Sequence, residues 1–127
     1  MEYLKLTREL KIQSTSLDVK KFADCPSDVL LGQDVRLGFP EVIGIEDILI
    51  DILENRRQQF DLEGIVRILP GNKPLYFDLC IRMFSNQLFL FFEEVTMQML
   101  WQQTLLEQTH ENSLFLLRLN AFQNQGD

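Results

Sequence analysis

The chain has 127 residues, of which 46% are hydrophobic, and it carries a formal net charge of −7. This length suits one domain with its own core, and the apolar content excludes an intrinsically disordered chain. The acidic balance argues against a nucleic-acid partner, because a phosphate backbone attracts clustered lysine and arginine. The chain is charged from Glu2 onward, so we expect no secretory signal, no membrane span and a cytoplasmic location.

The first half of the chain predicts two short strands and then several helices. Apolar residues on both sides of Thr7-Arg8-Glu9 predict two strands joined by a tight turn. Short helical segments are predicted over residues 17–23 and 26–32, the second ending at a C-cap glycine, Gly32. Residues 45–57 predict an amphipathic helix, because apolar side chains recur there at helical spacing: Ile45, Ile48, Leu49, Ile52 and Leu53.

Residues 59–96 predict three consecutive strands. Alternation in the first strand predicts one buried row, formed by Phe60, Leu62, Gly64, Val66 and Ile68. It leaves an outer row of Asp61, Glu63, Ile65 and Arg67. The second strand predicts a buried row of Leu75, Phe77, Leu79, Ile81 and Met83. The third run, residues 88–92, is apolar on both faces and therefore needs a cover on both. We expect an α+β fold, a five-stranded antiparallel sheet with short helices on one face.

A long helix is predicted over residues 97–123, which contain no glycine or proline, with Thr96 as its N-cap. Side chains at alternating spacings of four and three predict a coiled-coil seam: Trp101, Leu105, Gln108, Asn112, Phe115, Leu119 and Phe122. An asparagine in such a seam favours two strands. An amphipathic helix folded back on its own domain is the alternative. We expect a domain over residues 1–96 and an output helix over 97–127.

Several short motifs occur in a characteristic order. They are the segment from Pro26 to Asp34, which contains Leu31-Gly32, then Phe39-Pro40-Glu41, the helix at 45–57 and Glu94-Val95-Thr96. In this order they resemble the PAS domain family over residues 3–96, with Glu94 where the family's signature has Asp. The following helix resembles linkers of bacterial, notably cyanobacterial, sensor kinases and cyclases. The resemblance implies a PAS-type regulatory and dimerisation module in signal transduction, such as a two-component system.

PAS domains often bind a cofactor, and we expect none here. Residues 45–57 lack the histidine that would ligate haem, and neither Cys25 nor Cys80 has the surroundings of a flavin-binding cysteine. The two cysteines show no metal spacing and are expected to be reduced thiols. A carboxylate ligand would need a cation, for which Arg67 and Arg82 are the candidates, although both lie in the predicted outer rows. A small-molecule sensor with an apolar or carboxylate ligand therefore stays open as an alternative.

Catalysis is not expected, because the single histidine, His110, cannot form a catalytic triad and no glycine-rich phosphate loop occurs. Phosphotransfer through His110 is the third and least favoured hypothesis, because His110-Glu111 lacks the proline of the histidine-kinase phosphoacceptor motif. The leading hypothesis is a homodimer that passes a signal through Glu94-Val95-Thr96 to the C-terminal helix and a kinase or cyclase. Its predicted interface comprises Phe89, Phe91, Trp101, Leu105, Asn112, Phe115, Leu119 and Phe122.

Overall fold

The computed structural model describes residues 1–111, with side chains up to residue 106. Its strands are β1 (Glu2–Leu6), β2 (Ile12–Thr15), β3 (Gln59–Leu69), β4 (Lys73–Phe84) and β5 (Gln87–Glu94). Between β2 and β3 lie η1 (Val19–Phe22), η2 (Pro26–Asp28), α1 (Val35–Gly38), η3 (Pro40–Val42) and α2 (Glu46–Leu53). Helix α3 (Thr96–Glu111) follows β5.

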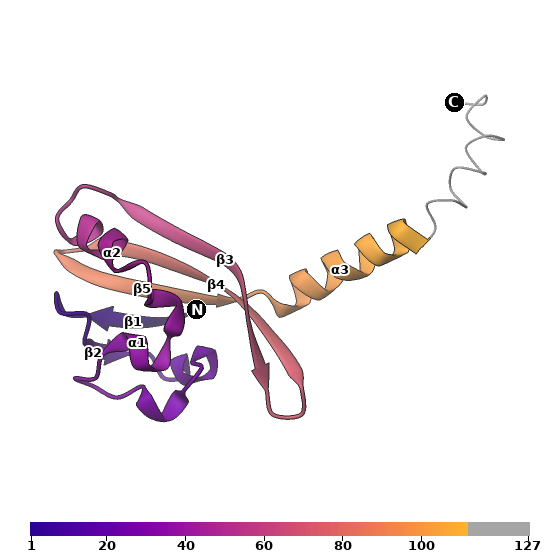
Figure 1. Ribbon diagram of the computed structural model, residues 1–127, viewed down its shortest axis with the longest axis horizontal. Coiled ribbons are helices and arrows are strands. Elements are labelled where there is room, and N and C mark those ends of the chain that lie inside the picture. The colour runs from indigo at the N-terminus through magenta and orange to yellow at the C-terminus, as the bar shows by residue number, and fades with distance from the viewer. Residues whose placement is uncertain (112–127) are drawn as a thin grey trace. The chain divides into compact units, whose positions relative to one another are not determined.

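The strands form one antiparallel sheet in the order β2-β1-β5-β4-β3 (Figure 1). The first strand therefore pairs with the last, and β5 lies at the centre of the sheet between β1 and β4. This arrangement confirms the predicted α+β class and the five-stranded antiparallel sheet.

The core lies between the inner face of the sheet and the short helices. Strand β4 supplies most of its predicted buried row, with Leu75, Phe77, Leu79 and Ile81 buried and Met83 partly buried, and β5 adds Leu88, Leu90 and Phe92. Helix α2 adds Leu49, Ile52 and Leu53, which its apolar spacing also predicts. No polar or charged residue of the described chain is fully buried.

A bulge in β3 reverses the faces predicted for the second half of this strand. The register against β4 shifts between Leu62 and Ile65, and Gly64 adopts a φ of 68°. The backbone N–H of Gly64 donates a hydrogen bond to Oδ1 of Asp78 at 2.9 Å. An inserted residue of this kind shifts the alternation by one and turns the following side chains over.

The predicted rows are therefore right before the bulge and wrong after it. Ile65 packs against the core, and Arg67 turns to the inner face. Val66 and Ile68, predicted as buried, are 44% and 65% exposed on the outer face. The interpretation of Arg67 as a solvated residue is also wrong.

The helices differ from prediction mainly at their ends. Helix α2 ends at Leu53 rather than at residue 57, because Asn55 takes a left-handed conformation and the backbone N–H groups of Arg56 and Arg57 donate to the carbonyl of Asp51. Helix α1 was not predicted. It is capped by Asp34, whose carboxylate accepts the backbone N–H of Arg36 at 2.9 Å.

The chain divides into two compact units, Met1–Thr96 and a second that begins at Met97. The predicted C-terminal helix is present as α3 up to Glu111. The rest of the predicted helix, with Asn112, Phe115, Leu119 and Phe122, lies outside the described residues.

Candidate functional site

An aromatic patch lies on the outer face of the sheet. We define it as Tyr3 of β1, Phe84 at the end of β4, and Phe89 and Phe91 of β5. The rings of Phe89 and Phe91 stack at a centroid distance of 5.7 Å, and the Phe84 ring packs edge-on at 5.9 Å from each. Tyr3 lies 6.1 Å from Phe89. These spacings are typical of favourable aromatic pairs, so the patch is one continuous apolar surface.

The predicted interface residues Phe89 and Phe91 are thus brought together, although each is partly buried by its neighbours rather than fully open. The most exposed ring is that of Phe84, at 54%. Sequence reasoning missed Phe84 and Tyr3. Tyr3 joins the patch because it pairs with Phe91 across the sheet. This pairing follows from the register of β1 against β5, which the sequence does not reveal.

Charged and polar side chains border the aromatic patch. Arg82 contacts Asp61 on β3, with Nη1 and Oδ1 2.6 Å apart, and this hydrogen bond lowers the pKa of the Asp61 carboxyl below its ordinary value of 3.8. Burial, and then the nearby charge of Asp61, raise the pKa of the Cys80 thiol. Lys5 lies opposite Phe89 on the other side. Arg82 therefore faces outward as predicted, and its guanidinium is already paired.

Phenylalanine rings occupy the interior between the sheet and the short helices. Phe22 of η1 lies 5.1 Å from Phe77 and 5.5 Å from Phe92, measured between ring centroids. Phe39 lies 5.0 Å from Phe92. All four rings are at most 1% exposed, so they belong to the core between the sheet and the short helices.

Arg67, the other candidate for a carboxylate ligand, binds a carboxylate of its own chain. Its Nη2 donates to Oε2 of Glu41 at 2.6 Å, and its Nε donates to the carbonyl oxygen of Phe22 at 3.0 Å. The guanidinium lies 5.4 Å from the centre of the Phe77 ring. The side chains of Arg67 and Glu41 are 11% and 15% exposed. The Arg67 guanidinium is thus paired with Glu41, a residue of the predicted Phe39-Pro40-Glu41 turn, rather than open to a carboxylate ligand.

The segment Glu94-Val95-Thr96 is tied to β4 at Tyr76. The backbone N–H of Val95 donates to the Tyr76 carbonyl at 2.8 Å, and the Tyr76 N–H donates to Thr96 Oγ1 at 3.0 Å. Glu94 pairs with Lys21 of η1 at 3.2 Å. Helix α3 begins at Thr96 itself, so the hydroxyl predicted to cap this helix binds the sheet backbone instead.

Helix α3 exposes several large apolar side chains. Trp101 and Leu105, predicted as seam residues, are both exposed, as are Met97, Leu100 and Leu106. Met97, Leu100, Trp101 and Thr104 border a surface hollow of about 260 Å³. The side chains of Gln108 and His110 are outside the described part, so Trp101 and Leu105 are the two predicted seam residues whose side chains are described, and the seam stays a prediction.

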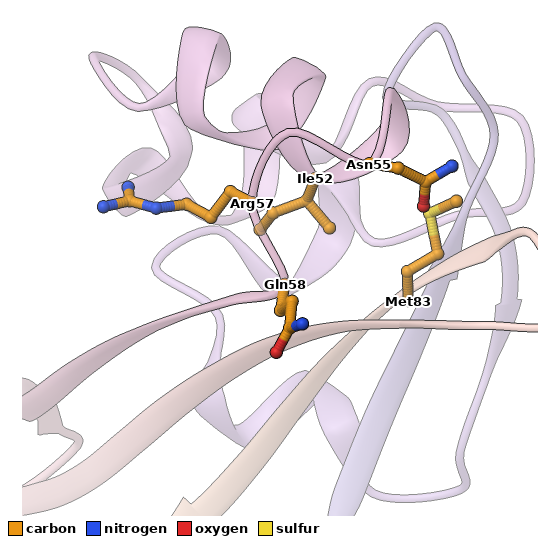
Figure 2. Close-up of a pocket in the computed structure, with 5 residues that line it drawn as sticks. All are labelled: Ile52, Asn55, Arg57, Gln58 and Met83. Atoms are coloured by element: carbon orange, nitrogen blue, oxygen red, sulfur yellow. The ribbon is translucent and has the colours of Figure 1, made fainter.

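A separate pocket of about 400 Å³ opens beside the C-terminal end of α2 (Figure 2). Ile52 and Met83 supply apolar atoms, and Asn55 and Gln58 supply side-chain amides. Arg57 also borders the pocket, but Figure 2 shows its guanidinium extending away from the other four side chains, and it lies 5.4 Å from the Phe60 ring. This volume falls in the range of small-molecule sites, about 300–1,000 Å³.

Among the side chains that the structure describes, up to residue 106, no cluster of three or more metal-ligating groups is found. No helix in this part of the chain combines the length and apolarity needed to cross a bilayer. Cys25 and Cys80 are both free thiols. No model of a known protein family matches the sequence, and no curated protein matches it significantly.

Proposed function

We propose that the chain is a PAS-type regulatory module that forms a homodimer and passes a conformational signal through α3 to a kinase or cyclase. The observation that carries the proposal is the aromatic patch. The open face of an antiparallel sheet is normally polar, because it faces water. A continuous row of rings on this face is therefore the mark of an interaction surface.

A second copy of the chain is the partner that best fits the patch. Lys5 and Glu93 border it with opposite charges, whereas Arg82 and Asp61 pair within one chain, so two copies related by a twofold axis can pair Lys5 with Glu93. The apolar side chains of α3 supply a second surface of the same kind, and a helix of this sort is stabilised when it packs against another helix.

Three further features support the PAS-type assignment. The order of elements, with two strands, short helices, a longer helix and a three-strand meander, is the one by which the sequence resembles this family. The motif Glu94-Val95-Thr96 lies where the last strand ends and α3 begins. The packed phenylalanine interior favours a module that acts by association rather than by holding a ligand or catalysing a reaction.

A charge placed in the patch tests the dimer. Phe89→Lys should give a monomer in size-exclusion chromatography with light scattering, because it puts charge into the centre of the interface. Ile68→Lys is the matched control, since it changes an apolar residue on the outer face of β3 that is outside the patch, and it should leave the dimer intact. A Phe89→Lys protein that dimerises as tightly as the wild type would remove the patch from the interface.

The pocket at the end of α2 favours a second candidate function, a small-molecule sensor. Its two amides and two apolar side chains suit a small ligand with one hydrogen-bonding edge and an apolar body. Native mass spectrometry of gently purified protein tests this candidate. A bound ligand adds mass to the native protein that is lost on denaturation. The Met83→Lys variant should show no such added mass, because the substitution places a charge in the pocket.

A further inference from the structure

The second half of the β3–β4 hairpin extends past β5. Pairing between β3 and β4 continues to Leu69 opposite Lys73, whereas β5 pairs with β4 only from Phe77 onward. We call residues 65–69 and 73–76 the arm. In Figure 1 its turn stands apart from the other strands. The bulge at Gly64 lies where the arm leaves the sheet, and it is held by the hydrogen bond from Gly64 to Asp78.

The arm is attached to the helical side of the domain through Arg67. This side chain binds Glu41 of η3 and the carbonyl of Phe22 in η1. Both partners of the Arg67–Glu41 pair are at most 15% exposed, whereas both side chains of every other ion pair within residues 1–106 are at least 25% exposed. Water screens those pairs strongly and this one weakly, so this pair has the largest effect when it is broken.

The same arm carries the residue that holds the start of α3. Val66 lies opposite Tyr76, next to the pairing of Arg67 with Leu75. Tyr76 in turn binds Val95 and Thr96 through its backbone. The ion pair and the first residue of α3 are therefore joined by one strand pairing and two hydrogen bonds. A bulge at the base of the arm supplies a point at which such a segment can bend.

We propose that the Glu41–Arg67 ion pair is a latch that has a closed and an open state, and that opening it moves the arm and loosens the start of α3. The latch rests on the proposed function, because it specifies how a change on the helical side reaches the output helix. Coupling of this kind requires an element with two arrangements that both ends influence. The arm, hinged at Gly64 and held by one largely buried ion pair, is that element.

Amide hydrogen exchange of the full chain, measured by NMR, tests the latch. Glu41→Gln removes the charge with little change in shape. It should raise the exchange rates of the Tyr76 and Val95 amides at least tenfold and leave that of Leu90, in the centre of the sheet, unchanged. Glu46→Gln is the control, since Glu46 pairs with Arg36 in a more exposed ion pair away from the arm, and it should change none of these rates.

Equal acceleration at Leu90 would show that the pair only stabilises the whole domain, and unchanged rates at Tyr76 and Val95 would show that no coupling exists. Either result overturns the latch. If Glu41→Gln does not fold, Glu41→Gln with Arg67→Met leaves no unpaired buried charge and should show the same local acceleration. Sedimentation of these proteins separates the two proposals: a monomeric wild type contradicts the dimer alone, and unchanged exchange contradicts the latch alone.

Discussion

Thr96 Oγ1 accepts the backbone N–H of Tyr76 at 3.0 Å, so the first residue of α3 is bound by its side chain to β4. The same hydroxyl lies 3.4 Å from the Tyr76 carbonyl oxygen. One side chain therefore continues the β4–β5 ladder by a further step and sets the point at which the strand ends and the helix begins.

Replacement of this hydroxyl should loosen the junction. Thr96→Val keeps the shape of the side chain but leaves the Tyr76 N–H without its acceptor, which should lower the free energy of unfolding by about 0.5–1.5 kcal/mol. Thr96→Ser keeps the hydroxyl and should cost less. Urea denaturation of the three proteins measures the difference. Equal costs for Val and Ser would mean that the methyl group, not the hydrogen bond, matters here.

Replacement of a core ring should cost far more than replacement of an outer cation on the same strand. Phe77 is fully buried against Phe22 and Phe92, so Phe77→Ala should destabilise the domain by about 3–5 kcal/mol. Arg82→Ala removes only a partly exposed pair and should cost less than about 0.5 kcal/mol. Chemical denaturation of both variants checks the two faces of β4, and reversed costs would contradict this register.

The strand β4 shows how far local alternation can be followed. Its apolar residues keep period two from Leu75 to Ile81, because no bulge interrupts the pairing with β5 from Phe77 onward. The predicted buried row of this strand, from Leu75 to Met83, is therefore confirmed up to Ile81, and Met83 is partly buried against the core. In β5 the inner face is buried at Leu88, Leu90 and Phe92, and a cover for the outer face stays a prediction.

Strand β3 shows where this reasoning fails. Phe60 and Leu62 follow the predicted pattern, but the bulge at Gly64 depends on an acceptor 14 positions away, Asp78. No local pattern encodes such a contact, and apolar residues at both Ile65 and Val66 fit either register. The sequence correctly predicts that Arg67 can bind a carboxylate, but it places this side chain on the outer face of the sheet instead of the inner face. Its partner Glu41 is 26 positions away and is found only in the fold.

Substitution at the bulge should be more costly than substitution beside it. Gly64→Ala forces a residue with a Cβ into a left-handed conformation, which should cost about 1–2 kcal/mol. The exposed neighbour Glu63 is the matched control, and Glu63→Ala should change the free energy of unfolding by less than about 0.5 kcal/mol. Thermal and urea unfolding of both variants give these values. A tolerated Gly64→Ala would show that the bulge is not needed.

Acidification should weaken the pairing of Asp61 with Arg82. The pKa of Asp61 is lowered in the folded state, so the unfolded chain binds its proton at higher pH. The stabilisation is complete above the ordinary value of 3.8 and is lost as the pH falls through the lower folded pKa. In an NMR titration, Arg82→Met should raise the midpoint of the Asp61 carboxyl toward 3.8. An unchanged midpoint would show that Arg82 is not the cause.

The central claim is that the chain forms a dimer through the aromatic patch and α3. Sedimentation equilibrium at micromolar concentration, on the full chain and on a version that ends at Thr96, tests it most directly. The truncated version keeps the first compact unit and its core. We predict a dimer for the full chain and a much weaker dimer for the truncated one. A truncated chain that dimerises equally well would remove α3 from the interface, and a monomeric full chain would contradict the account.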